Sequence, residues 1–282
     1  MYDLIIGTKS RDGKKSKIDY LSLANLPTPF DGLWVSPSEG LEYTLSDDGT
    51  YYICSGIGYC TDYVVYIPET HNGKPVKSIR GVRAERIVIP SSFEEIPANA
   101  FMSDQYEEKT TVSCKVIGEN LKTVGSGAFY CNSYLKKVIL PDSVTVINSL
   151  AFASTGLRRF NFPPNLQIIG GSAFSGVPLS GKISIPNSVK TIAGWAFSNL
   201  SGLDDKEVVI GSGVESIGEQ AFSISLSLKK VTMKCKSPTI GANAFSNCND
   251  LVEINVAWAQ GAVAGAPWGA TKATINYNYK GE

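Results

Sequence analysis

Apolar residues recur along this chain in short alternating runs, each closed by a proline or a glycine. In Val138-Ile139-Leu140 the period of two predicts a short strand with Val138 and Leu140 on one side and Ile139 on the other. Pro141 then ends the strand, because proline cannot donate the next hydrogen bond of a ladder. The same kind of run occurs at 87–90, 138–141, 160–163, 183–186 and 208–211.

A second marker, the dipeptide Ala-Phe, recurs with about the same spacing as these runs. It occurs seven times, with successive phenylalanines 22 to 28 residues apart. A third marker, an apolar pair such as Val144 and Ile147 or Val189 and Ile192, follows the strands. Three markers at one spacing predict a tandem repeat, because a fixed period is the sequence signature of repeat proteins. The seven dipeptides end at Phe101, Phe129, Phe152, Phe174, Phe197, Phe222 and Phe245.

One repeat cannot bury its own apolar face, so each must stack on its neighbours. We expect the strands to line up as a parallel sheet, the alanine to let the backbone pass, and the phenylalanine to fill the interior. The prediction is a leucine-rich-repeat-like solenoid, a β-rich parallel stack with short 3-10 or turn segments on its convex side. All seven Ala-Phe pairs are then core and not site.

The repeats resemble the BspA-like leucine-rich repeats of bacterial surface proteins. The match covers about 80–257 and is clear in 185–197, where a strand, Pro, Ser-Val-x-x-Ile and Gly-x-x-Ala-Phe follow one another. A lead-in over 43–79 is also similar to that family. The resemblance implies a solenoid fold and a role in adhesion or in protein and glycan binding. One departure is the repeat at 114–118, where Lys115 falls at an expected inward position after an insertion.

The ends of the chain do not follow the repeat. We expect an arm or linker over 1–40, a hairpin that caps the first coil over 41–80, seven repeat units over 81–257 and a C-terminal cap over 258–282. The basic residues Lys14, Lys15 and Lys17 belong either to a solvated tail or to an arm that docks on another subunit. The segment 265–270 is similar to closing segments of repeat proteins encoded by bacteriophages.

Composition excludes some partners and leaves the location open. The 26 basic and 26 acidic residues cancel, so no global field attracts nucleic acid or an anionic membrane. No apolar run has the length of a membrane span, and 1–17 lacks a signal-like apolar core. We expect either a mature fragment of an exported surface protein or a component of a virus particle.

Candidate chemistry is sparse. The six cysteines are scattered without C-x-x-C spacing, which argues against zinc and favours free thiols, with a bridge between Cys54 and Cys60 as the alternative. The one histidine, His71, lies in an expected turn, and Asp47-Asp48-Gly49 is typical of a hairpin more than of a calcium loop. We therefore expect no cofactor, no metal and no catalysis; a hydrolase is a remote third alternative.

The outer face of the expected sheet is the candidate site. The outward residues one place before the inward ones are mainly cations, at strand spacings of about 4.8 Å on the concave surface. Such a row favours either solvation or an acidic partner. The leading hypothesis is a recognition or adhesion module that binds a protein or glycan here; the alternative is a phage structural protein docked by its arm. The expected binding residues are Arg86, Lys137, Arg159, Lys182 and Lys230, in a row that also contains Glu207 and Glu253.

Overall fold

A computed structural model of the chain describes residues 3–6, 19–22, 37–62, 64–82, 84–103, 113–116, 120–202 and 207–280. The chain divides into two units, residues 1–36 and 37–282. In the first unit β1 (Asp3–Ile6) and β2 (Asp19–Ser22) pair as an antiparallel two-stranded sheet. The second unit contains all the repeats.

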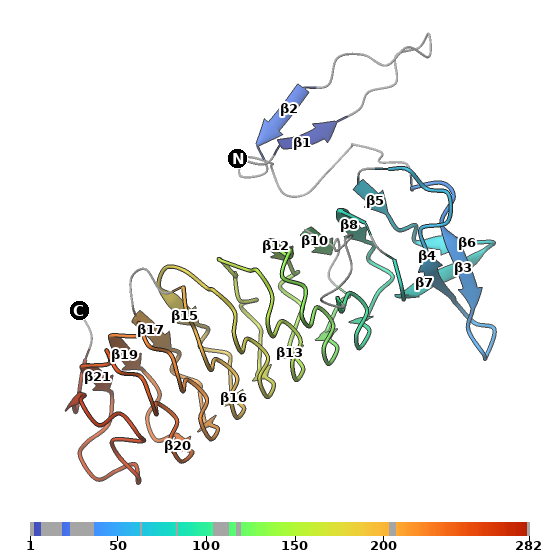
Figure 1. Ribbon diagram of the computed structural model, residues 1–282. Helices are drawn as coiled ribbons and strands as arrows, with labels where there is room; N and C mark the ends of the chain where they lie inside the picture. Colours follow the sequence, from blue (N-terminus) through green and yellow to red (C-terminus); the bar gives the residue numbers. More distant parts are fainter. Residues whose placement is uncertain are drawn as a thin grey trace. The chain divides into compact units, whose positions relative to one another are not determined.

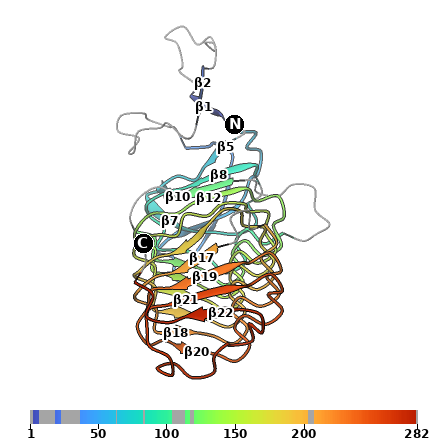
Figure 2. The same ribbon diagram turned by 90° about the vertical axis from the view of Figure 1, so that its left-hand side faces the viewer.

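The second unit is a parallel β-solenoid of about nine turns, which confirms the predicted fold class. Its coils stack so that strands from successive repeats form two ladders (Figure 1). Figure 2 shows strands of the ladders lying one above another across the stack. No helix occurs in the ranges that the structure describes, and the expected 3-10 segments are not confirmed, because turns occupy their place.

The first ladder consists of the predicted apolar runs and is divided into two sheets. Burial alternates as the period of two predicts in most strands of this ladder: in β17, for example, Val208 and Ile210 are buried while Glu207 and Val209 are partly exposed. In β19 and β21 the third residue, Thr232 or Asn255, is buried as well. The first sheet contains β5 (Val64–Tyr66), β8 (Arg86–Ile89), β10 (Ser113–Val116) and β12 (Lys137–Ile139). The second contains β15 (Ile183–Ile185), β17 (Glu207–Ile210), β19 (Lys230–Met233), β21 (Glu253–Val256) and β22 (Thr274–Asn276).

The second ladder is one sheet of seven two-residue strands from the third sequence marker. Neighbouring backbones approach closely just after these strands: a Cβ on Gly170 would lie 2.5 Å from the nitrogen of Ser149, so only glycine fits there. The strands are β9 (Glu95–Ile96), β11 (Thr123–Val124), β13 (Val146–Ile147), β14 (Ile168–Ile169), β16 (Thr191–Ile192), β18 (Ser216–Ile217) and β20 (Thr239–Ile240).

The Ala-Phe turns form a third line of contact between coils. The N–H of each phenylalanine donates to the carbonyl of the alanine in the next coil, as from Phe174 to Ala196 at 2.8 Å. At the last coil Phe245 donates instead to the carbonyl of Trp268 at 2.9 Å. The segment around Pro267 and Trp268 thus takes the place of a further Ala-Phe turn, while β22 continues the first ladder.

The seven phenylalanine rings form the predicted buried column. Successive ring centroids lie 5.0 to 5.5 Å apart with interplanar angles of at most 20°. Six of the rings are wholly buried and Phe101 is 5% exposed. Stacked aromatic pairs at this separation add to the stabilisation that burial provides.

One expected strand, 160–162, is not formed. Both inward positions of this coil hold phenylalanine, and the rings of Phe160 and Phe162 pack edge-on against Phe174 at 4.9 and 5.3 Å. Rings are larger than the aliphatic side chains Ile183 and Ile185 of the next coil, so we infer that their volume holds the backbone out of the ladder. The first ladder is therefore interrupted between β12 and β15.

Lys115 does not take the inward register position that the sequence analysis gave it. Lys115 pairs with Val88 and Ile139, which are the partly exposed members of their strands. Cys114 takes the register position of the buried Ile87 and Val138. The insertion had shifted the expected register by one residue, and such a shift exchanges the two faces of a strand.

The segment before the repeats forms a separate four-stranded sheet. β3 (Glu42–Leu45) and β4 (Tyr52–Gly56) are an antiparallel pair, and β6 (Thr70–His71) and β7 (Lys74–Ile79) are another, with β4 and β7 parallel. In the first connection, hydrogen bonds from Ser46 and Thr50 lower the pKa of Asp48 to about 2. The carboxylate of Asp48 thus holds a hairpin turn.

Bulky residues occupy left-handed backbone positions at two of the Ala-Phe turns. The residue before alanine has a positive φ, for example 56° at Asn99, where asparagine is well tolerated. Leu150 and Trp195 have φ of 60° and 61° at the same position. A Cβ-bearing, bulky residue is strained there.

We expect Phe174→Ala to lower the free energy of unfolding by about 3 to 5 kcal/mol, because it opens a cavity in the middle of the buried column. Chemical denaturation followed by circular dichroism measures this change. Ile168→Ala, at a side chain that is 41% exposed, serves as the control and should cost less than about 1 kcal/mol. Equal effects of the two substitutions would contradict the role given to the column.

We expect Trp195→Asn to stabilise the fold by about 0.5 to 1 kcal/mol, because asparagine relieves the strain of a positive φ. Trp195→Ala is the matched control, since it removes the ring and keeps the strained Cβ. Thermal melting of both variants separates the two effects. A gain with alanine equal to that with asparagine would show that the indole, and not the backbone, causes the strain.

Candidate functional site

The outer face of the first ladder presents two rows of side chains, one residue from each row per coil. The first residue of each long strand forms one row, and the residue two places later forms the other, because alternate residues share a face. Ladder register fixes the order: Glu207 pairs with Lys230, which pairs with Glu253. In the second row Val209, Thr232, Asn255 and Asn276 follow one another.

The structure places the five expected binding residues on this ladder or in its interruption. Arg86, Lys137 and Lys230 begin β8, β12 and β19, and Lys182 directly precedes β15. Arg159 lies in the coil between the two sheets. Whether these residues bind a ligand stays a prediction.

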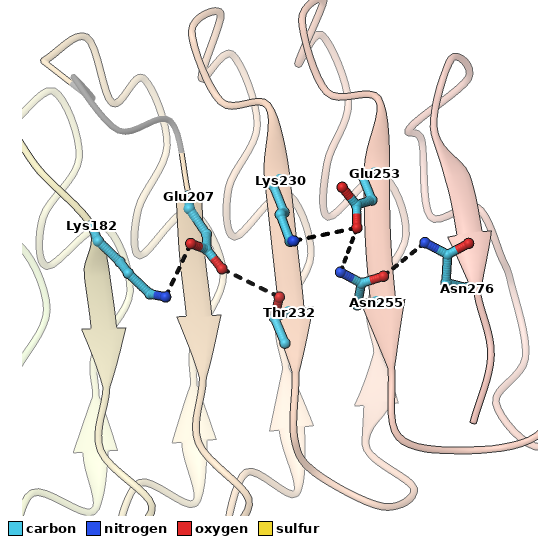
Figure 3. A network of polar contacts seen from close by, with 7 residues as sticks. All are labelled: Lys182, Glu207, Lys230, Thr232, Glu253, Asn255 and Asn276. Atoms are coloured by element: carbon cyan, nitrogen blue, oxygen red, sulfur yellow. Dashed lines mark hydrogen bonds and ion pairs between the residues drawn. The ribbon is translucent and has the colours of Figure 1, made fainter. Parts of the chain in front are cut away.

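Ion pairs compensate two of these cations (Figure 3). Lys182 Nζ lies 3.0 Å from Glu207 Oε2, and Lys230 Nζ lies 3.4 Å from Glu253 Oε1. Desolvation lowers the pKa of Lys230, but its hydrogen bond and charge interaction with Glu253, together with Tyr279 and Glu207, outweigh that effect and raise the pKa above its ordinary value. The charge along β15, β17, β19 and β21 alternates and is not a row of like charges.

Polar side chains of the second row tie these carboxylates in place (Figure 3). Asn255 is wholly buried; its Nδ2 donates to Glu253 Oε1 at 2.7 Å, and its Oδ1 accepts a bond from Asn276 at 2.8 Å. Thr232 Oγ1 donates to Glu207 Oε1 at 3.5 Å. The sequence alone did not identify Thr232 and Asn255 as members of a network. The signal for a network was the recurrence of short polar side chains at one register position in three successive strands.

Cations near the interruption lack such partners. Lys136, Lys137, Arg158 and Arg159 have no carboxylate within ion-pair distance in the described part of the chain. Lys137 is partly exposed and the other three are exposed. The face therefore changes from uncompensated positive charge at these two coils to alternating charge beyond β15.

Other expected features lie elsewhere. Lys14, Lys15 and Lys17 fall outside the described residues. His71 stacks on Tyr43 at a ring distance of 3.9 Å and contacts Tyr52 edge-on at 4.8 Å. Across the described ranges no group of three His, Cys, Asp or Glu side chains is placed to hold a metal ion, and no helix is long and apolar enough to cross a membrane.

Five of the cysteines, Cys54, Cys60, Cys131, Cys235 and Cys248, are free thiols. Burial raises the pKa of Cys54 to about 12 and the pKa values of Cys235 and Cys248 to about 11. Cys60 and Cys131 are partly exposed. The buried thiols are thus poorly reactive, because the thiolate is the nucleophilic form.

Comparison with known proteins identifies the repeat. Residues 80–204 and 178–259 match the sequence profile of the BspA type leucine rich repeat region, in six copies. The chain belongs to the BspA-type leucine-rich repeat family. No curated protein matches it significantly.

Several solved structures are similar to this BspA-type chain, and one of them supports its fold. The leucine rich repeat protein of T. pallidum (TpLRR) is 24% identical with a TM-score of 0.55, over 77% of this chain and 90% of that one. A leucine-rich repeat protein from Bacteroides ovatus is 16% identical with a TM-score of 0.35, over 86% and 76% of the two chains. The pneumococcal vaccine antigen PcpA is 14% identical with a TM-score of 0.27, over 83% and 88%. The T. pallidum structure is similar to this chain in fold alone.

Alkylation by iodoacetamide at about pH 8 tests the thiols of the BspA-type solenoid. We expect Cys60 and Cys131 to react in the folded protein. Cys54, Cys235 and Cys248 should react only after denaturation, because at a pH well below a raised pKa little of the thiol is present as thiolate. Mass spectrometry of tryptic peptides locates the modified residues. Rapid labelling of Cys248 in the folded state would contradict the burial described above.

Proposed function

We propose that this BspA-type solenoid is a non-catalytic recognition module of the cell surface or extracellular space, which binds a partner through the outer face of its first ladder. Membership of a repeat family of surface proteins supports a protein-binding or adhesion role. The observation that carries the choice of face is the pair of ordered side-chain rows on its strands of three or four residues. Among the described residues, the second ladder has only two-residue strands and a single row.

The inward side of every coil is committed to packing, so recognition depends on the outer surfaces. The second ladder has two-residue strands and offers one outward side chain per coil. The first ladder offers two per coil and includes charged, amide and hydroxyl groups held in fixed positions. Preorganised polar groups on a rigid sheet lower the entropy that binding costs.

The choice of face does not select the class of partner, nor does it select between a surface protein and a virus-particle component. Leucine-rich repeat proteins generally bind proteins, so we take a protein as the leading partner, with a glycan as the other expected class. Neither the structure nor the comparisons favour a phage component over a surface protein.

A steric block on each ladder tests the proposal. Ser184→Tyr places a bulky ring at an exposed outward position of β15, and Thr191→Tyr places one at a partly exposed outward position of β16 in the same coil. We expect saturable binding of the chain to at least one protein on an array of secreted and cell-surface proteins, and a drop of about tenfold or more with Ser184→Tyr, or about 1.4 kcal/mol.

The matched variant Thr191→Tyr should bind as the unaltered chain does, and circular dichroism should show both variants folded. A loss with Thr191→Tyr and not with Ser184→Tyr would move the site to the second ladder. An array without any saturable ligand would reject a protein-recognition module.

A further inference from the structure

Four cations lie together where the first ladder is interrupted. We call Lys136, Lys137, Arg158 and Arg159 the cationic cluster. They come from equivalent places in two consecutive coils, each pair following a wholly buried leucine, Leu135 or Leu157. The rings of Phe152 and Phe174 keep these two coils about 5.2 Å apart, and β13 and β14 pair directly, so like charges from the two coils are close neighbours.

This crowding of positive charge is not relieved within the described chain. Lys182, in the next coil, has Glu207 at 3.0 Å, whereas no carboxylate lies within ion-pair distance of the cationic cluster. Lys136 Nζ donates to the carbonyl of Ser133 at 3.1 Å, which satisfies a hydrogen bond and leaves the charge uncompensated. Like charges on neighbouring coils repel one another, so an anion bound here would relieve a repulsion.

The interruption adds apolar surface beside these charges. Phe160 and Phe162 are partly exposed, whereas the inward residues Ile183 and Ile185 of the next coil are buried. Both rings pack against the column. The ring centroids of Phe160 and Phe152 lie 5.1 Å apart, and those of Phe162 and Phe197 lie 6.0 Å apart. The two residues are therefore partly accessible while the column fixes their rings, and rigid aromatic residues of this kind anchor interfaces.

Unpaired peptide groups complete the surface. In the described ranges, no hydrogen bond joins the backbone of residues 159–162 to another part of the chain. Peptide groups left out of a ladder form bonds with water or with a partner. The interrupted coil thus combines positive charge, two partly exposed phenylalanines and free peptide donors and acceptors.

We infer that the cationic cluster, together with Phe160 and Phe162, binds an acidic, extended segment of a protein partner that carries an apolar side chain. This inference rests on the proposed function and specifies the partner. Such a segment supplies carboxylates for the cations, an apolar group for the rings and peptide groups for the free backbone. A polyanionic glycan would compensate chiefly the positive charge of the cationic cluster. The test must therefore distinguish binding of a glycan from binding of an acidic peptide.

The test uses a fluorescent synthetic peptide rich in glutamate with a central phenylalanine. Two further probes are the same peptide with serine in place of that phenylalanine, and a heparin-derived oligosaccharide. Fluorescence polarisation with the full chain should show saturable binding of the first peptide that weakens as salt rises, because screening acts on exposed charges. Replacing the phenylalanine should weaken binding severalfold.

Paired variants locate the binding. Lys137→Glu with Arg159→Glu should reduce peptide affinity tenfold or more. Lys234→Glu with Lys236→Glu changes the net charge equally at exposed lysines away from the cluster and should leave affinity within about twofold, since distant surface charges are screened. Lys137→Arg, which keeps the charge, should retain binding.

Three results would overturn the inference. These are equal losses in the two double variants, binding of heparin with none of the peptide, or peptide binding that ignores the phenylalanine. If the array still yields a protein whose binding Ser184→Tyr blocks while the acidic peptide does not bind, the inference fails and the proposed function stands.

Discussion

The structure depends on one repeated interaction, the contact of each phenylalanine ring with the rings of the coils on either side. The rings lie 5.0 to 5.5 Å apart, close to the spacing of strands in a sheet, so one translation satisfies the column and both ladders together. The bond from each phenylalanine N–H to the next alanine carbonyl has the same repeat. Since no coil buries its own ring, a coil is stable only between neighbours.

This common translation explains which parts of the fold the sequence predicts. The Ala-Phe dipeptides and the alternation in runs such as 208–210 are direct consequences of one buried side per coil, so the fold class, the column and the inward residues follow from the pattern. The strand expected at 160–162 fails because alternation shows which residues face inward and does not show whether their volume fits. Lys115 was misplaced because an insertion hides the register until the neighbouring strands Arg86–Ile89 and Lys137–Ile139 define it.

The sequence predicts where the candidate site lies, but it does not predict which of the charges there form ion pairs. Sequence spacing places Lys182 and Lys230 at equivalent outward positions, but their ion pairs depend on rotamers of side chains in adjacent coils, about 25 residues away along the chain. The buried Asn255 is similar, since its partners Glu253 and Asn276 meet only when β21 and β22 pair. Lys137 and Arg159 form no such ion pair in the described part of the chain, and the sequence spacing does not distinguish them from Lys182 and Lys230.

A stack in which coils contact only their neighbours confines a local irregularity to one place. The coil with Phe160 and Phe162 leaves the ladder, yet the column continues through Phe152, Phe174 and Phe197 with centroid distances of 5.2 and 5.3 Å. The second ladder also runs on unbroken from β13 through β14 to β16. The added ring volume therefore prevents strand pairing in the first ladder alone, and it leaves Phe160 and Phe162 partly exposed next to Arg158 and Arg159. Core packing and surface chemistry are coupled in this coil, whereas in the regular coils the outward residues vary independently of the column.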